Sequence, residues 1–231
     1  MRLSVIIPAY NEQATVLDII AQVQACGVPD LELVVVNDCS TDSTQEVLDT
    51  IRSRDRLRII HHEINQGKGA AIRTAQAHIT GEVVVIQDAD LEYNPREFPR
   101  MLKVIEDDIA DAVYGSRYSG SELLVDTFWH YLGNRLLTTY SNVLCNLHLT
   151  DMETCYKMMR TSLFKQINIE CNRFGFEPEV TAKLSRLRAR IFEMPIGYQA
   201  RSFDDGKKID WKDGVAALWY ITKYNLLSRR I

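Results

Sequence analysis

The chain carries, at residues 83–92, the stretch Val83-Val84-Val85-Ile86-Gln87-Asp88-Ala89-Asp90-Leu91-Glu92. Four apolar residues come first, as in a strand that is covered on both faces of its sheet. An acidic cluster follows at once, so its carboxylates lie where ligands bind on open α/β sheets, at the carboxyl end of a strand. Carboxylate oxygens favour Mg²⁺ or Mn²⁺. The stretch predicts a strand and a cation-binding turn; the alternative is a solvated acidic turn, since Asp-x-Asp is a common tripeptide.

Short apolar runs of the same kind recur through the first half of the chain. The expected strands are Leu3–Pro8, Leu31–Asn37, Leu57–His61, Val83–Gln87 and Ala112–Gly115. Helical patterns separate them, as where Val16, Ile19, Ile20 and Val23 recur at i, i+3, i+4 and i+7. This alternation predicts an α/β fold, a mostly parallel sheet with right-handed crossovers and flanking helices.

The second half has a different pattern. It predicts a long helix over Leu123–Leu149, strand-like pieces, a helix near Pro178–Leu187, a strand near Arg190–Pro195 and a C-terminal helix near Gly214–Leu227. No linker rich in Pro, Gly or Ser separates the halves. We therefore expect one domain over residues 1–231.

Composition excludes several classes of protein. The 231 residues are 46% hydrophobic and 25% charged, which is ordinary for a globular chain and unlike a disordered one. With 27 Lys and Arg against 31 Asp and Glu, the net charge of −4 leaves no broad footprint for nucleic acid. The five cysteines have no CxxC spacing, so we expect reduced thiols. The first apolar run is too short for a signal peptide, and no run suits a spanning helix, so we expect a cytoplasmic chain.

Three polar segments follow other predicted strands. Pro8-Ala9-Tyr10-Asn11-Glu12 offers an aromatic ring for a nucleobase, and Asp38 in Asn37-Asp38-Cys39-Ser40-Thr41-Asp42 can accept from a base N–H. Both segments also suit plain helix capping. In Asn65-Gln66-Gly67-Lys68-Gly69, the glycines let backbone N–H groups approach an anion and Lys68 adds charge. Together, at neighbouring strand ends, the segments predict a pocket for a nucleotide diphosphate and a metal.

These motifs, with Gly115-Ser116-Arg117, resemble those of family-2 glycosyltransferases of GT-A fold. Within that family, the chain is most similar to dolichyl-phosphate mannose synthases and bacterial polyprenyl-phosphate glycosyltransferases. The resemblance runs from Leu3 to about Lys208. It implies a GT-A, Rossmann-like sheet, with residues 1–118 binding the nucleotide sugar and residues 119–231 binding the acceptor through amphipathic interface helices.

The resemblance also implies roles for single residues. Those expected to bind the nucleotide sugar are Pro8, Tyr10, Glu12, Asp38, Asp88 and Ala89, together with Lys68. Asp90 and Glu92 match metal ligands for Mn²⁺ or Mg²⁺. Asp90, Arg117 and Arg201 are the expected catalytic residues. The acceptor phosphate is assigned to Arg117, Arg135, Lys157, Arg201 and Lys207, because cations suit phosphate oxygens; for the arginines the alternative is a surface ion pair.

Two departures from the synthases favour a UDP-sugar over a GDP-sugar as the donor. Glu92-Tyr93 replaces Gln-His, and residues 151–157 replace a Ser-Gly-Phe-Arg type of stretch. The acceptor decides whether a base is needed. A polyprenyl phosphate is already an anion, whereas a saccharide hydroxyl, the alternative acceptor, requires a carboxylate base such as Asp151, Glu177 or Glu179.

Two aromatic helices favour the lipid acceptor. Phe128-Trp129-His130-Tyr131 opens one of them, and Trp219, Tyr220 and Tyr224 precede Arg229 and Arg230 in the other. Such helices suit peripheral contact with an anionic membrane surface. Core packing or a dimer interface is the alternative. A binding module without activity is a further hypothesis, which the intact Asp88-Ala89-Asp90 disfavours. No sequence feature indicates an oligomeric state.

Overall fold

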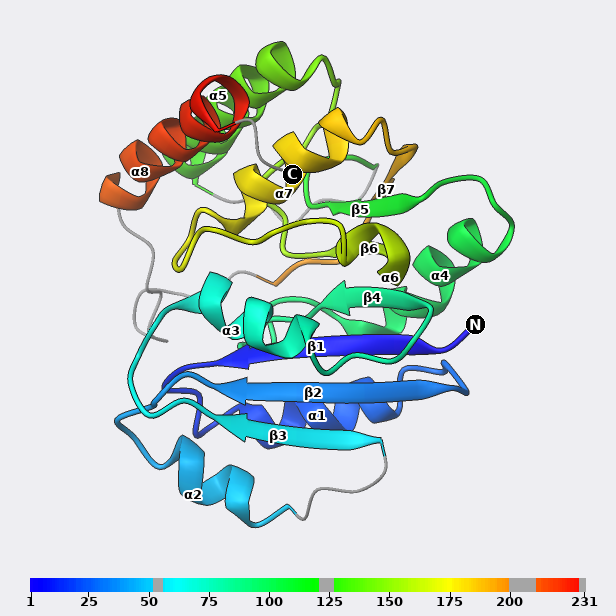
Figure 1. Ribbon diagram of the computed structural model, residues 1–231, viewed down its shortest axis with the longest axis vertical. Helices are drawn as coiled ribbons and strands as arrows, with labels where there is room; N and C mark the ends of the chain where they lie inside the picture. The colour runs from blue at the N-terminus through cyan, green and yellow to red at the C-terminus, as the bar shows by residue number, and fades with distance from the viewer. Residues whose placement is uncertain (52–55, 121–126, 200–210, 229–231) are drawn as a thin grey trace.

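The computed structural model describes residues 1–51, 56–120, 127–199 and 211–228 (Figure 1). Within these ranges the chain forms a seven-stranded sheet in the order β3-β2-β1-β4-β6-β5-β7. The strands are β1 Leu3–Ala9, β2 Leu31–Asn37, β3 Leu57–His61, β4 Val83–Ile86, β5 Ala112–Ser116, β6 Lys157–Arg160 and β7 Ile191–Pro195. The predicted mostly parallel sheet with flanking helices is confirmed.

One strand runs against the others. β6 pairs antiparallel with both β4 and β5, and the other strand pairs are parallel. The carboxyl ends of the parallel strands therefore meet at one edge of the sheet, as the predicted site requires. Because β6 is reversed, the loop that precedes it reaches this same edge.

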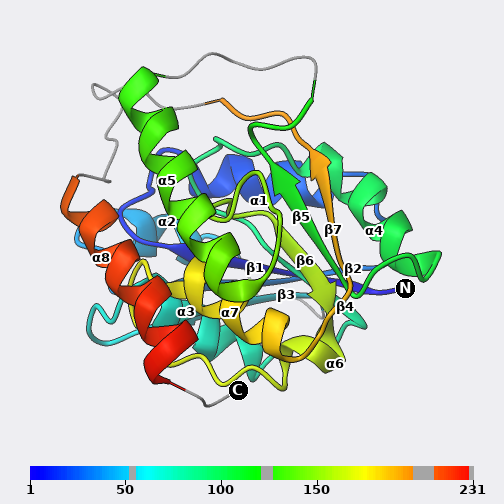
Figure 2. The same cartoon turned by 90° about the horizontal axis from the view of Figure 1, so that it is seen from above.

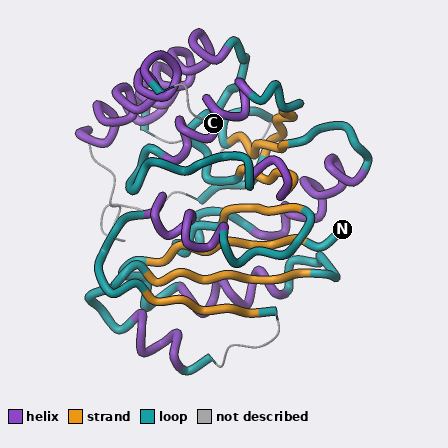
Figure 3. Tube along the Cα trace, in the orientation of Figure 1, coloured by secondary structure: helices purple, strands orange, loops and turns teal. Residues whose placement is uncertain are grey.

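Helices cover both faces of the sheet (Figures 1 and 3). Seen from above, α1 and α4 lie on one side, and α3, α6 and α7 lie on the other (Figure 2). α5 and α8 pack side by side beyond α7. The helical elements are α1 Val16–Gln24, α2 Thr44–Asp49, α3 Lys68–Gln76, η1 Pro95–Glu97, α4 Phe98–Glu106, α5 Phe128–Cys145, α6 Thr161–Phe164, α7 Phe176–Arg186, α8 Trp211–Thr222 and η2 Lys223–Leu227.

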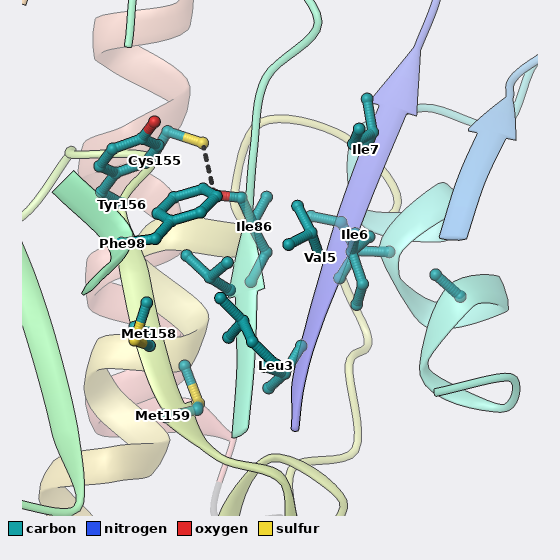
Figure 4. Packing of buried hydrophobic residues seen from close by; sticks show 14 of the residues in the cluster. Leu3, Val5, Ile6, Ile7, Ile86, Phe98, Cys155, Tyr156, Met158 and Met159 are labelled. Carbon is teal, nitrogen blue, oxygen red and sulfur yellow. Dashed lines mark hydrogen bonds between the residues drawn. The ribbon is translucent and has the colours of Figure 1, made fainter. Parts of the chain in front are cut away.

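The core joins the two halves of the chain (Figure 4). β1 and β4 are buried on both faces, as their continuous apolar runs predict. Tyr156, just before β6, packs against Phe98 of α4 with ring centroids 5.3 Å apart. The Cys155 thiol donates to the Ile86 carbonyl oxygen at 3.6 Å. All five cysteines are free thiols, so packing, hydrogen bonds and ion pairs hold the residues on either side of β6.

Some element boundaries differ from the predicted ones. α5 is shorter than the predicted helix over Leu123–Leu149, of which residues 123–126 lie outside the described part of the chain. Its other end is set by Asn146, whose left-handed backbone (φ 54°, ψ 47°) ends the helix before Leu147. The C-terminal helix changes from α-helical to π-helical hydrogen bonding over η2.

A buried carboxylate fixes the edge of the sheet opposite the strand ends. Glu32 of β2 accepts hydrogen bonds from Ser4 Oγ at 2.5 Å, Thr80 Oγ1 at 2.6 Å and Gly81 N at 2.9 Å, and also from the Thr80 amide. Burial raises the pKa of Glu32, but these hydrogen bonds outweigh burial and hold it below its ordinary value. The network ties the turn before β4 to β1 and β2.

We expect Glu32→Gln to lower the free energy of unfolding by about 1–3 kcal/mol at pH 7, because buried donors lose their acceptor. A lowered folded-state pKa stabilises the protein above the ordinary pKa of 4.5 and stops doing so as the pH falls through the folded value. The difference from wild type should therefore shrink as the pH falls below 4.5 and through the lowered folded-state pKa. Urea unfolding at several pH values measures it. Exposed Glu46→Gln is the control; an equal effect of both substitutions would contradict the role of Glu32.

Candidate active site

The loop before α3 is organised around Asp38. The Asp38 carboxylate accepts from His62 Nδ1 at 2.7 Å, Gln66 N at 3.0 Å and Gly67 N at 2.6 Å. Gly67 has φ 97°, and a Cβ there would lie 2.3 Å from the Asn172 carbonyl oxygen, so the turn requires glycine. Asp38 is predicted to bind a base; in the structure it is buried and also shapes its own loop.

Lys68, the first residue of α3, lies between two carboxylates. Its Nζ is 2.8 Å from Asp88 Oδ1, at the end of β4, and 2.9 Å from Glu177 Oε1, in the first turn of α7. Burial lowers the pKa of Lys68, but its attraction to Asp88 and Glu177 outweighs burial and raises the pKa well above the usual value. The ammonium group therefore stays charged, at the point where the two halves of the site meet.

Asp90 and Glu92 lie on a tight turn that follows β4. Leu91 between them has φ 63°, and Asp90 Oδ1 accepts from the Glu92 amide at 3.1 Å. Tyr198 OH donates to Glu92 Oε2 at 2.7 Å. Both acidic residues are partly exposed, and their oxygens suit a hard divalent cation. In the described ranges, no three or more His, Cys, Asp or Glu side chains are grouped as a metal site.

A buried ion pair closes the site on the side of β5. Arg117 holds Asp151 in a fork, with Nε–Oδ2 at 2.7 Å and Nη2–Oδ1 at 2.8 Å. The Arg117 guanidinium also lies 5.2 Å from the Tyr198 ring centroid. Burial raises the pKa of Asp151, but Arg117 outweighs burial and holds it below the ordinary value. Asp151 is therefore ionised, and it accepts hydrogen bonds from two of the N–H groups of the Arg117 guanidinium.

Two sequence-based assignments do not match the positions found. Lys157, predicted at the acceptor phosphate, is fully buried; its Nζ donates to the Met152 carbonyl oxygen at 2.8 Å and to that of Thr154. It closes the loop before β6 and has no solvent-facing ammonium to offer. Glu179, a candidate base, is fully buried and accepts from two backbone amides and from Lys183 Nζ at 2.8 Å. Both residues hold the scaffold.

The remaining predicted residues are more dispersed. Tyr10 is exposed after β1, and Glu12 accepts from Thr15 Oγ1 at 2.9 Å at the start of α1. Pro8 is partly exposed within β1, and Ala89 is buried beside Asp88. Arg135 is exposed on α5. Arg201 and Lys207 lie outside the described residues.

Sequence reasoning missed Tyr198 and Glu153. Tyr198 has no local signal, because it reaches Glu92 from 106 residues away. Glu153 lies in the stretch before β6, where only the reversed strand brings it to the site. Glu153 Oε1 is buried and has no hydrogen-bond partner among the described residues. Burial, and then the charge of Glu177, raise the pKa of Glu153 to about 7.

Comparisons with known proteins identify the family and the fold of the chain. The family model of Glycosyl transferase family 2 matches residues 4–167. An undecaprenyl-phosphate mannosyltransferase of Micrococcus luteus is 28% identical, over 99% of this chain and 96% of that protein. An undecaprenyl-phosphate 4-deoxy-4-formamido-L-arabinose transferase of Edwardsiella ictaluri is 26% identical, over 88% of this chain and 62% of that protein.

A solved structure has the same fold. Glucosyl-3-phosphoglycerate synthase from Mycobacterium tuberculosis, crystallised with Mn²⁺, UDP and phosphoglyceric acid, matches with a TM-score of 0.72 at 18% identity. The match covers 98% of this chain and 79% of that one. The resemblance inferred from the motifs and the predicted GT-A fold are thereby confirmed.

We expect Arg117→Met to lower the free energy of unfolding by about 3 kcal/mol or more, because it leaves the buried Asp151 carboxylate unpaired. Arg117→Met combined with Asp151→Asn should recover much of that loss, since the unpaired charge is then gone. Urea unfolding of the single and double variants measures both effects. A loss below about 1 kcal/mol in the single variant would show that this ion pair does not hold the loop before β6.

Proposed function

We propose, since the chain belongs to glycosyl transferase family 2, that it transfers a sugar from a nucleotide diphosphate sugar to a polyprenyl phosphate. Two relatives support the acceptor by their names, and one of them aligns along nearly its whole length. A UDP-sugar is favoured, and a GDP-sugar is the other donor. We also propose that residues 1–118 bind the donor and that residues 119–231 bind the acceptor.

One observation of the site favours a phosphate over a hydroxyl as the acceptor group. Each of the three carboxylates considered as a base is engaged with a cation: Asp151 with Arg117, Glu177 with Lys68, and Glu179 with Lys183. A hydroxyl acceptor requires a carboxylate that is free to take its proton. A phosphate monoester is already an anion and attacks without a base. The pairing of these three carboxylates therefore supports a phosphate acceptor, and Glu153, whose Oε1 has no partner among the described residues, is the carboxylate whose role as a base has to be tested.

The reaction is then one displacement. A phosphate oxygen of the acceptor attacks the anomeric carbon, the bond from that carbon to the diphosphate oxygen breaks, and the nucleotide diphosphate leaves with the electron pair. In this proposal Lys68, which lies beside Asp88, offsets the charge of the leaving diphosphate, which is electrostatic stabilisation of the transition state. Tyr10, Glu12 and Asp38 border the region proposed for the nucleoside.

Asp90 and Glu92 are the proposed ligands of Mn²⁺ or Mg²⁺. Their carboxylates are two residues apart on one turn, next to Asp88 and Lys68. When bound there, the cation supplies positive charge to the diphosphate. Arg201, with Asp90 and Arg117, stays the proposed catalytic set, and Arg135 and Lys207 stay proposed contacts of the acceptor phosphate.

A polyprenyl chain keeps the acceptor in a bilayer, so the proposal includes peripheral contact with the membrane. Large apolar side chains are exposed on α5, among them Phe128 and Trp129, and on α8, among them Leu218 and Trp219. None of the helices in the described ranges is long and apolar enough to span a bilayer. The free thiols fit a reducing compartment, so we place the chain at the cytoplasmic face.

The acceptor is tested with purified protein, Mn²⁺ and a panel of UDP- and GDP-sugars, with and without farnesyl phosphate as a short polyprenyl phosphate. Release of nucleotide diphosphate should depend on farnesyl phosphate, and the donor that gives it identifies the nucleotide and the sugar. Asp90→Asn should lower the rate by about 100-fold or more at fixed Mn²⁺. Release that occurs only with a saccharide acceptor would overturn the proposal.

Membrane contact is tested by co-sedimentation with vesicles of anionic phospholipid. Trp129→Ser and Trp219→Ser should each weaken vesicle binding by about tenfold, because each removes an exposed aromatic ring from the interface. Ile109→Ser is the matched control, since Ile109 is an exposed apolar residue beyond the end of α4. Unchanged vesicle binding, together with a shift from dimer to monomer, would assign these helices to a dimer interface instead.

A further inference from the structure

Glu153 is unlike the other carboxylates that surround the site. Asp88 and Glu177 share Lys68, Asp151 is held by Arg117, and Glu92 accepts from Tyr198. Glu153 Oε1, in contrast, is buried and has no partner among the residues that the structure describes. Buried polar atoms in folded proteins are nearly always satisfied, and an exception needs an explanation. A bound ligand that makes a hydrogen bond to Glu153 Oε1 would explain this exception.

The surroundings of Glu153 limit the form in which it can bind. Glu177 on α7 and Asp151 on its own loop repel a negative charge at Glu153, whereas Lys157 on β6 and Arg117 after β5 attract it. Both cations are already engaged, Arg117 by Asp151 and Lys157 by the carbonyl oxygens of residues 152 and 154. Burial is the largest influence and favours the uncharged carboxyl.

An uncharged carboxyl group can donate a hydrogen bond to an anionic ligand. It carries one O–H donor, whereas an ionised carboxylate only accepts hydrogen bonds and repels a phosphate. The pKa of about 7 means that both forms are populated near neutral pH. A phosphate that binds nearby adds negative charge and shifts Glu153 further toward the uncharged form. Binding of the ligand and protonation of Glu153 are therefore linked.

The position of Glu153 favours the acceptor over the donor. It lies in the loop before β6, beside the Arg117–Asp151 pair, and thus in the half of the chain that the proposed function assigns to the acceptor. Glu153 as a residue is partly exposed, while its Oε1 is buried. The nucleotide-side groups Asp38 and Asp88 engage partners of their own, on loops that follow β2 and β4.

We infer that Glu153 is a binding residue of the acceptor site, which in its neutral form donates its O–H to a phosphate oxygen of the acceptor. This inference rests on the proposed function and explains how a phosphate can bind among acidic side chains. It also predicts how the affinity for the acceptor changes with pH. Affinity for the acceptor is full below the pKa of Glu153 and falls as the pH rises through it, because the ionised form repels the phosphate.

The test compares wild type with Glu153→Gln. The glutamine amide keeps an N–H donor and has no titrating proton. Isothermal titration calorimetry with farnesyl phosphate, without donor, gives the dissociation constant at pH 6.0 and pH 8.5. Between these values, affinity should fall about tenfold more in wild type than in Glu153→Gln. The second ionisation of the phosphate affects binding to both proteins equally. The ratio of their dissociation constants at each pH therefore reports the ionisation of Glu153 alone.

Folding is checked separately. Urea unfolding at pH 8 should find Glu153→Gln at least as stable as wild type, because it removes an unpaired carboxylate from a buried position. Glu153→Ala should bind farnesyl phosphate more weakly than Glu153→Gln at both pH values, since it lacks any donor. A loss of affinity that glutamine rescues supports a hydrogen bond from this position.

Two results would overturn the inference in distinguishable ways. If both proteins bind farnesyl phosphate with the same pH dependence, Glu153 does not contact the acceptor, and the proposed function stands. If neither protein binds it at any pH, the phosphate acceptor itself is wrong. A Glu153→Gln protein that binds a saccharide acceptor normally but turns over at least 100-fold more slowly would instead make Glu153 a general base for a hydroxyl.

Discussion

The reversal of one short strand determines the architecture of the site. β6 has four residues, yet it pairs with β4 on one side and β5 on the other and so joins the two halves of the sheet. Because it runs against its neighbours, its leading loop reaches the edge where the parallel strands end. Asp151 and Glu153 enter the site through that loop. A parallel strand here would have presented its opposite end and left this edge of the sheet without these side chains.

Charge at this edge is balanced in pairs that link distant parts of the chain. Lys68 joins the end of β4 to the first turn of α7, and Arg117 joins the end of β5 to the loop before β6. A buried ion pair adds little net stability, but leaving either partner alone is costly. The pairs therefore act as positional constraints. They fix where the elements lie at this edge of the sheet.

Sequence reasoning recovered the parallel half of the fold well, since continuous apolar runs such as Val83–Ile86 have few other interpretations. It also placed Asp88 and Lys68 together, because the strand ends and the start of α3 meet at one edge. It failed where partners are remote or the strand direction was unknown. The sequence predicted Lys157 as a cation available to the acceptor phosphate. In the structure the side chain is buried, and its Nζ donates to the Met152 carbonyl oxygen in the loop before β6. No periodicity in the sequence predicts that Tyr198 reaches Glu92.

The double engagement of Lys68 also bears on how this site can evolve. One ammonium group serves Asp88 and Glu177, which are 89 positions apart in the sequence. Replacing either carboxylate leaves Lys68 with one partner, whereas replacing Lys68 leaves the buried Glu177 and the partly exposed Asp88 without it. The three positions thus form an epistatic unit, in which the order of substitutions matters more than their number.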